Sequence, residues 1–197
     1  MNIWVQRADA PDWAEIARVC ADTGLAGSPV EEDERAAFVE HWIRPYRDLR
    51  PGWTWVAVCD KAVVGYLTGC PDALAFEDER RRAFDPSPDS RDFFPEAVRL
   101  KLRTDHPGHL MMNVMADYRG LGAGAKLLQA FFSELRHAGV LSAHLVCGPG
   151  AHVYFEKMAF REEFAVTPAP GLVLRAMTRT VEDPLRILMR GRELTPE

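Results

Sequence analysis

Cysteine, long apolar runs and an excess of positive charge are all scarce in this 197-residue sequence. The four cysteines form no CxxC pair, which argues against a metal site or a disulfide framework and indicates buried, reduced thiols. No segment approaches the roughly 18 apolar residues of a membrane-spanning helix, and the N-terminus does not resemble a secretory leader. We therefore expect a cytoplasmic protein that has no membrane partner and holds no metal.

The charge balance argues against a further class of partner. Lysine and arginine number 24 and aspartate and glutamate 29, so the formal net charge is −5. Because nucleic-acid-binding domains usually carry a basic surface, we expect no nucleic-acid partner.

What is present is the composition of an ordinary globular domain. Apolar residues make up 47% of the chain and charged residues 27%, and this length suffices to bury a full core. Neither an internal repeat nor a low-complexity tract appears. We predict a single domain over residues 1–180 and a C-terminal tail over 181–197, in which the apolar spacing of Leu185, Leu188 and Met189 favours a docked helix.

Apolar periodicity predicts alternating strands and helices in the first half of the chain. Residues 3–5 alternate as in a strand, and the next helix ends at Gly24. Ser28-Pro29 is predicted to open a second helix that ends before Pro45. Residues 53–59 and 62–68 then form a hairpin around a two-residue turn.

Residues 76–107 are charged and interrupted by prolines, but they are too apolar for a free linker. This composition predicts an insertion of two short helices joined by an irregular loop. Within it, the charged run at residues 77–82 is either a partner surface or, more commonly, a solvated helix face.

A nearly all-apolar strand over residues 109–115 is predicted to lie centrally in a sheet, since both of its faces are apolar. A glycine-rich turn follows at 118–124 and leads into a helix with its buried face between Leu127 and Leu135. The remaining elements expected are a strand at 143–147, a short helix around Tyr154 and strands from Arg161 and over 172–177.

The turn after the central strand is the most informative segment. Gly120, Gly122 and Gly124 remove side chains where several backbone N–H groups can converge, and the following helix N-terminus adds partial positive charge. Arg119 supplies one formal charge. This arrangement predicts a phosphate site.

Of the known phosphate motifs, one fits without adjustment. A nucleoside-triphosphate loop needs glycine before its lysine, but Ala125 precedes Lys126. A dinucleotide loop needs an acidic residue about 20 positions later, where the sequence runs Val146-Cys147-Gly148. The pattern Arg-x-x-Gly-x-Gly is satisfied by Arg119, Gly122 and Gly124.

The segment from Val114 to Leu128 resembles the acetyl-coenzyme A signature of the GNAT superfamily of N-acetyltransferases. The element order over residues 3–177 agrees, and residues 151–160 resemble that family's Ala-x-x-x-Tyr-Glu-Lys-x-Gly-Phe motif. The resemblance implies an α/β fold with a mixed, mostly antiparallel sheet of six to seven strands flanked by helices. It also implies acetyl-coenzyme A as cosubstrate.

A narrower similarity involves residues 44–51, 64–69, Asp72 and Phe76. They resemble the acetyltransferase-like domain at the C-terminus of some O-GlcNAc hydrolases and its free-standing bacterial relatives. This likeness would account for the insertion over 76–107.

The resemblance assigns coenzyme binding to the central strand, the glycine loop and the short helix. The pantetheine arm would pair with the strand backbone, the pyrophosphate would lie on the loop, and a backbone N–H near Val114 would polarise the thioester carbonyl. The set is Asn113, Val114, Met115, Arg119, Gly120, Leu121, Gly122, Ala123, Gly124, Ala125, Lys126, Tyr154, Phe155 and Lys157.

The catalytic residues are harder to assign. Asp72 is the first candidate for the base that deprotonates the amine, with a turn cap as its alternative role, and His109 is the second. The family's usual tyrosine acid falls on Phe155, so Tyr154 is the candidate proton donor. Ala159 replaces the usual glycine.

Two functions follow from these features. The first is an N-acetyltransferase acting on a primary amine of a small molecule or a protein. The second is a catalytically silent acetyl-coenzyme A-binding or interaction module, which the phenylalanine at the usual tyrosine position favours. We expect a monomer or a homodimer.

Overall fold

The computed structural model describes residues 2–24, 28–84, 93–182, 187–189 and 192–194. Much of the irregular loop predicted in the insertion therefore lies outside the described residues. The elements are β1 (Ile3–Arg7), α1 (Asp12–Thr23), α2 (Arg35–Trp42), α3 (Arg44–Leu49), η1 (Pro51–Trp53), β2 (Thr54–Cys59), β3 (Ala62–Cys70), α4 (Ala73–Ala83), α5 (Glu96–Asp105), β4 (Gly108–Val114), η3 (Ala116–Tyr118), α6 (Ala123–His137), β5 (Ser142–Cys147), α7 (Ala151–Lys157), β6 (Arg161–Ala169), β7 (Leu172–Thr180), β8 (Ile187–Met189) and β9 (Arg192–Leu194).

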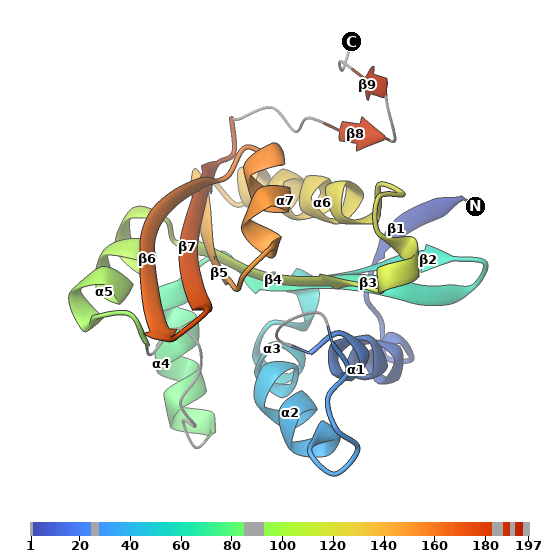
Figure 1. Ribbon diagram of the computed structural model, residues 1–197, viewed down its shortest axis with the longest axis horizontal. Helices are drawn as coiled ribbons and strands as arrows, with labels where there is room; N and C mark the ends of the chain where they lie inside the picture. The colour runs from blue at the N-terminus through green and yellow to red at the C-terminus, as the bar shows by residue number, and fades with distance from the viewer. Residues whose placement is uncertain (1, 25–27, 85–92, 183–186, 190–191, 195–197) are drawn as a thin grey trace. The chain divides into compact units, whose positions relative to one another are not determined.

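The first seven strands form one sheet in the order β1-β2-β3-β4-β5-β7-β6 (Figure 1). The pairs β1–β2, β2–β3, β5–β7 and β6–β7 are antiparallel, whereas β4–β5 is parallel. This topology confirms the predicted mixed, mostly antiparallel sheet with β4 inside it. No helix among the described ranges is both long enough and apolar enough to span a membrane.

By its contacts the chain divides into two compact units. Unit 1 holds Met1–Gly69, Met112–Phe132 and Ile187–Glu197, and unit 2 holds Cys70–Met111 and Ser133–Arg186. The prediction of a single domain over residues 1–180 is not tested by this division and stays a prediction.

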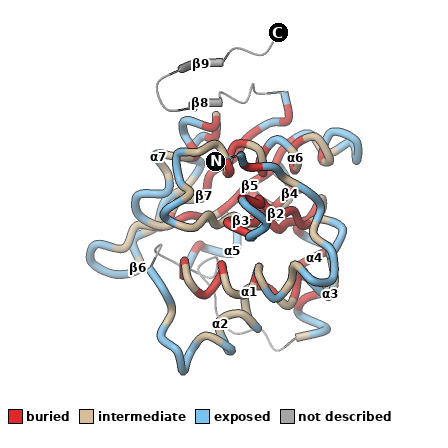
Figure 2. The backbone as a smooth tube through the Cα atoms, turned by 90° about the vertical axis from the view of Figure 1, so that its right-hand side faces the viewer, coloured by how far each residue is buried: buried red, intermediate tan, exposed pale blue. Residues whose placement is uncertain are grey.

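In unit 1, helices cover both faces of the strands. Helices α1 to α3 lie on one face of β1–β3, and the first turns of α6 lie on the other (Figure 1). Every residue of β2 is buried (Figure 2). On the α6 face, the rings of Trp53 and Trp55 each meet Phe131 edge-on with 6.0 Å between centroids.

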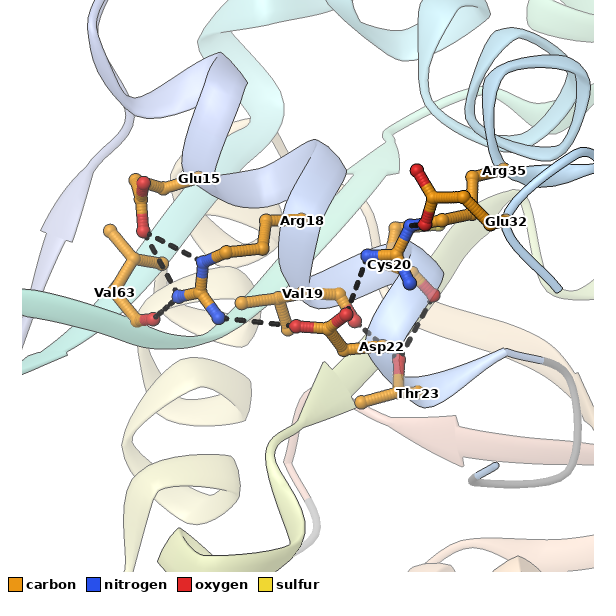
Figure 3. A network of polar contacts seen from close by, with 9 residues as sticks. All are labelled: Glu15, Arg18, Val19, Cys20, Asp22, Thr23, Glu32, Arg35 and Val63. Atoms are coloured by element: carbon orange, nitrogen blue, oxygen red, sulfur yellow. Dashed lines mark hydrogen bonds and ion pairs between the residues drawn. The ribbon is translucent and has the colours of Figure 1, made fainter. Parts of the chain in front are cut away.

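An ion-pair network holds α1 to β3 and to the start of α2 (Figure 3). Arg18 donates to the Val63 carbonyl at 2.8 Å and pairs with Glu15 at 3.0 Å. Asp22 accepts from Arg18 at 3.3 Å and from Arg35 at 2.5 Å. Because these side chains are partly exposed, the network orients the helices more than it stabilises the fold.

In unit 2, α5 packs on the sheet and its C-terminal end is bound to β5. Phe94 and Leu102 share a buried cluster with Leu174 and Ala176 of β7. Two side chains of β5 donate to carbonyls at the end of α5. They are Ser142 Oγ to Asp105 O at 3.1 Å and His144 Nδ1 to His106 O at 2.6 Å.

Most elements agree with the sequence predictions, including the hairpin, both insertion helices and the four free, buried cysteines. The second helix is present and ends before Pro45 as predicted, but its start was predicted wrongly, because it begins at Arg35 and not at Ser28-Pro29. The tail helix is also wrong where the tail is described, since β8 and β9 pair as a hairpin. Short apolar runs do not distinguish a helix from a strand.

The charged run of α4 is not a fully solvated face. Glu77 and Arg80 are 6% and 7% exposed, and Arg80 Nη2 lies 3.1 Å from Glu77 Oε1. Arg81, which is half exposed, reaches the same oxygen at 3.2 Å. Because Glu77 and Arg80 are paired, both can be buried. The polarity of each residue alone does not predict this burial.

Candidate functional site

The glycine loop has the backbone conformation that its sequence predicts. Gly120 and Gly122 have φ of +76° and +86°, a region that favours glycine. Helix α6 begins directly afterwards at Ala123, and the Lys126 N–H donates to the Gly122 carbonyl at 3.1 Å. Gly124 therefore lies in the first turn of α6, so the strained turn depends on two of the three glycines.

Arg119 fastens this loop to the end of β4. Its Nε donates to the Val114 carbonyl at 3.0 Å, and the side chain remains exposed. The next N–H, that of Met115, donates to the Val64 carbonyl of β3 at 2.9 Å. The loop thus starts from a fixed strand end, to which Arg119 is bonded just before α6 begins in the sequence.

Gly65 lets β3 and β4 approach closely in unit 1. A Cβ at this position would lie 3.0 Å from the Asn113 carbonyl oxygen and 3.0 Å from Val114 Cγ2. Such a side chain would move the backbone of β4 at the residues that lead into the loop. The sequence offered no reason to include Gly65 in the site.

Lys126 reaches the first strand of the sheet. Its Nζ donates to the Ile3 carbonyl of β1. The ammonium therefore ties α6 to the first strand. Its role at the outer phosphates stays a prediction.

Asn113 is half-buried and is joined to a tyrosine of β3 in unit 1. Its Nδ2 donates to the Tyr66 hydroxyl at 2.9 Å. Tyr66 has no exposed surface. Burial raises the Tyr66 pKa well above its ordinary value and that of Cys20 to about 11, so both stay protonated at neutral pH.

Asp72 is the N-cap of α4. Its Oδ1 accepts from the Ala75 N–H at 3.0 Å, and the side chain is exposed. This is the turn-capping role considered from the sequence. Capping occupies one carboxylate oxygen and leaves the other for a further partner.

His109 lies at the start of β4, in unit 2, and is 6% exposed. Its ring packs against that of His144, 4.9 Å between centroids. In the parallel ladder Gly108 pairs with Ala143 and His109 with His144, and Leu110 does not continue it. The ring is thus deep in unit 2, a position that also suits a structural histidine.

Helix α7 places Tyr154 and Phe155 in different surroundings. Phe155 is 7% exposed and packs on Phe160 with 5.4 Å between ring centroids. The Tyr154 hydroxyl is buried and, among the described residues, has no hydrogen-bond partner. Burial raises its pKa, so the hydroxyl keeps its proton at neutral pH. Lys157 on the same helix is exposed.

Ala159, just after α7, has a φ of +65°. The Phe160 N–H donates to the Phe155 carbonyl at 2.9 Å, as in a helix C-cap that normally uses glycine. The backbone therefore has a left-handed conformation here, although alanine and not glycine occupies the position.

The predicted residues fall into one group in each unit. Asn113 to Met115 and the loop from Arg119 to Lys126 are together in unit 1, whereas Asp72, His109 and the α7 residues are in unit 2. Sequence reasoning missed Tyr66, since no local pattern links it to Asn113 at 47 positions' distance. Within the described ranges no three histidine, cysteine, aspartate or glutamate residues gather as a metal site.

Comparisons with known proteins agree with this geometry. The profile of the Acetyltransferase (GNAT) family matches residues 13–160. The crystal structure of SsHAT is similar, with a TM-score of 0.76 and 21% identity over 93% of this chain and 100% of that one.

Two further solved structures share the fold. The structure of yncA from Salmonella typhimurium with its cofactor acetyl-CoA has a TM-score of 0.57 at 19% identity, covering 93% of this chain and 96% of that one. The polyamine N-acetyltransferase of Drosophila melanogaster, which catalyses formation of N-acetylagmatine, has a TM-score of 0.63 at 14% identity, covering 91% and 100%. At such low identities these likenesses show the fold alone.

Proposed function

Because this chain belongs to the Acetyltransferase (GNAT) family, we propose that it transfers an acetyl group from acetyl-coenzyme A to a primary amine of a small molecule or a protein. The observation that carries the proposal is the loop of unit 1. This loop contains Arg119 and two glycines with positive φ, and it leads directly into the N-terminus of α6.

These residues fit the coenzyme. Apart from the neighbours of Gly120 in the chain, no atom of the described part of the protein lies within 4 Å of where a Cβ would stand, so the loop backbone is open on that side. The amides before α6 and the Arg119 guanidinium would hold the pyrophosphate. The strand backbone at Asn113, Val114 and Met115 would hold the pantetheine arm. An acidic chain can therefore bind an anionic cosubstrate, since oriented amides supply much of the field.

Bound acetyl-coenzyme A supplies the acetyl group. The transfer forms an amide C–N bond, breaks the thioester C–S bond and moves one proton from the amine to the leaving sulfur. Tyr154 is our candidate for the proton donor, because its buried hydroxyl is protonated and its proton is not used in a bond within the described residues. Asp72, through its second oxygen, or His109 would take the amine's proton.

One observation supports the second function, a catalytically silent module. Phe155 stands where the family usually has tyrosine, and it is packed in the apolar interior of unit 2. If Tyr154 does not replace the missing hydroxyl, the chain is a catalytically silent acetyl-coenzyme A-binding or interaction module.

Release of free thiol from acetyl-coenzyme A separates the two functions. The full chain is mixed with acetyl-coenzyme A and, in turn, agmatine, spermidine, an N-blocked lysine peptide and a peptide with a free N-terminus. We expect at least one amine to accelerate release. Tyr154→Phe should lower kcat by about 100-fold or more, the usual contribution of a placed acid.

Asp72→Asn is the companion variant. Asparagine caps a helix as well as aspartate does, so the melting temperature should stay unchanged while the base is lost. A normal kcat in this variant would indicate that His109, and not Asp72, is the base that takes the amine's proton. Absence of amine-dependent release from a wild-type chain that binds acetyl-coenzyme A would leave the silent module as the function.

Three finer statements belong to the same proposal. Closeness to the acetyltransferase-like domain of O-GlcNAc hydrolases is supported by the sequence motifs alone. A cytoplasmic location is supported by four free, buried cysteines, which suit a reducing compartment. A monomeric or homodimeric state remains our expectation.

A further inference from the structure

The side chain of Asn113 presents one defined chemical group to the outside of unit 1. Its Nδ2 donates a hydrogen bond to the Tyr66 hydroxyl at 2.9 Å. Asn113 is itself only half-buried, and among the described residues its Oδ1 accepts no hydrogen bond from the protein and is not sealed from solvent. The exposed end of this amide is therefore a hydrogen-bond acceptor.

Tyr66 fixes that orientation. An amide side chain is free to turn over unless a neighbour distinguishes its two ends. The Tyr66 hydroxyl accepts from the Nδ2 end of the Asn113 amide at 2.9 Å, which leaves Oδ1 on the open side. Since Tyr66 is fully buried, turning the amide over would break the bond that Nδ2 makes to its hydroxyl.

Asn113 directly precedes Val114, the strand end at which we place the thioester carbonyl. We propose that Asn113 Oδ1 accepts a hydrogen bond from an N–H of the acceptor amine, and that Tyr66 is the positioning residue that aims it; this rests on the proposed function. Holding one N–H directs the nitrogen lone pair toward the carbonyl carbon. The site thereby prefers acceptors that donate N–H and disfavours anionic ones.

Steady-state kinetics with the best amine of the panel test this role. Asn113→Ala should raise KM for the amine about fivefold, the usual effect of losing one hydrogen bond. Tyr66→Phe should give a similar rise, because the amide then turns freely.

The decisive variant is Asn113→Asp. A carboxylate presents acceptor oxygens at both positions and needs no orientation. Adding Tyr66→Phe to N113D should therefore change KM by less than about twofold. Thr68→Val is the matched stability control. This variant removes a buried hydrogen bond, 2.8 Å long, between the hydroxyls of Thr68 and Thr54. Thr68 lies in β3, the strand of Tyr66, and the bond between Asn113 and Tyr66 stays in place. We expect KM to be unchanged.

Each contrary result has a distinct meaning. An active chain in which Asn113→Ala leaves KM unchanged would overturn the role of Asn113. If Tyr66→Phe raises KM for the amine equally in the wild-type and N113D backgrounds, Tyr66 acts through packing and its positioning role is overturned. A wild-type chain that acetylates none of the amines would overturn the proposed function, and this role with it.

Discussion

Single residues show where polarity misleads a reading of the sequence. Glu77 and Arg80 belong to a run that reads as solvated, yet both are buried because they pair with each other. Asn113 reads as a single polar interruption of an apolar strand, yet it is held by a tyrosine of another strand. In both cases a polar partner accounts for the position of the side chain, and the partner of Asn113 lies 47 positions away along the chain.

Ala159 carries backbone strain that can be removed. Its φ of +65° costs an L-residue roughly 1 kcal/mol or more, whereas glycine adopts this conformation freely. We predict that Ala159→Gly raises the free energy of unfolding by about 0.5–1 kcal/mol. This is the strain relieved minus the cost of the entropy that glycine adds to the unfolded chain. Urea unfolding followed by circular dichroism measures this.

The control for Ala159→Gly is the same replacement inside a regular helix. Ala130 lies within α6, where glycine should lower the free energy of unfolding by about 1 kcal/mol. A loss of stability from Ala159→Gly as well would refute the assignment of strain to Ala159.

At the scale of the element, the glycine loop can be tested against a turn of equal geometry. Gly120 and Gly139 have φ of +76° and +72°, and apart from their chain neighbours no atom of the described residues lies within 4 Å of where a Cβ would stand. Alanine at either position should therefore cost about 1 kcal/mol of stability through backbone strain alone. Only Gly120 belongs to the proposed phosphate site.

We predict that Gly120→Ala weakens acetyl-coenzyme A binding about tenfold, because strain relieved by a backbone shift turns the loop N–H groups away from the pyrophosphate. Gly139→Ala should bind acetyl-coenzyme A as the wild type does. Equal affinities of the two variants, measured by calorimetry, would remove the loop from the binding site.

At the scale of the whole molecule, the sequence predicted what depends on local chemistry. The strand-loop-helix from Asn113 onward could be recognised because left-handed turns demand glycine and phosphates demand N–H groups. Contacts over long separations could not be predicted. Lys126 binds a carbonyl 123 positions away, and Tyr66 meets Asn113 across 47 positions. Both contacts depend on the packing of the folded sheet.

Titration of acetyl-coenzyme A into the full wild-type chain by isothermal calorimetry tests the account most directly. The loop, the left-handed glycines and Arg119 together predict one saturable site with a Kd in the micromolar range or tighter, a range typical of cosubstrates. No detectable heat of binding at about 1 mM ligand would contradict both the acetyltransferase and the silent binding module.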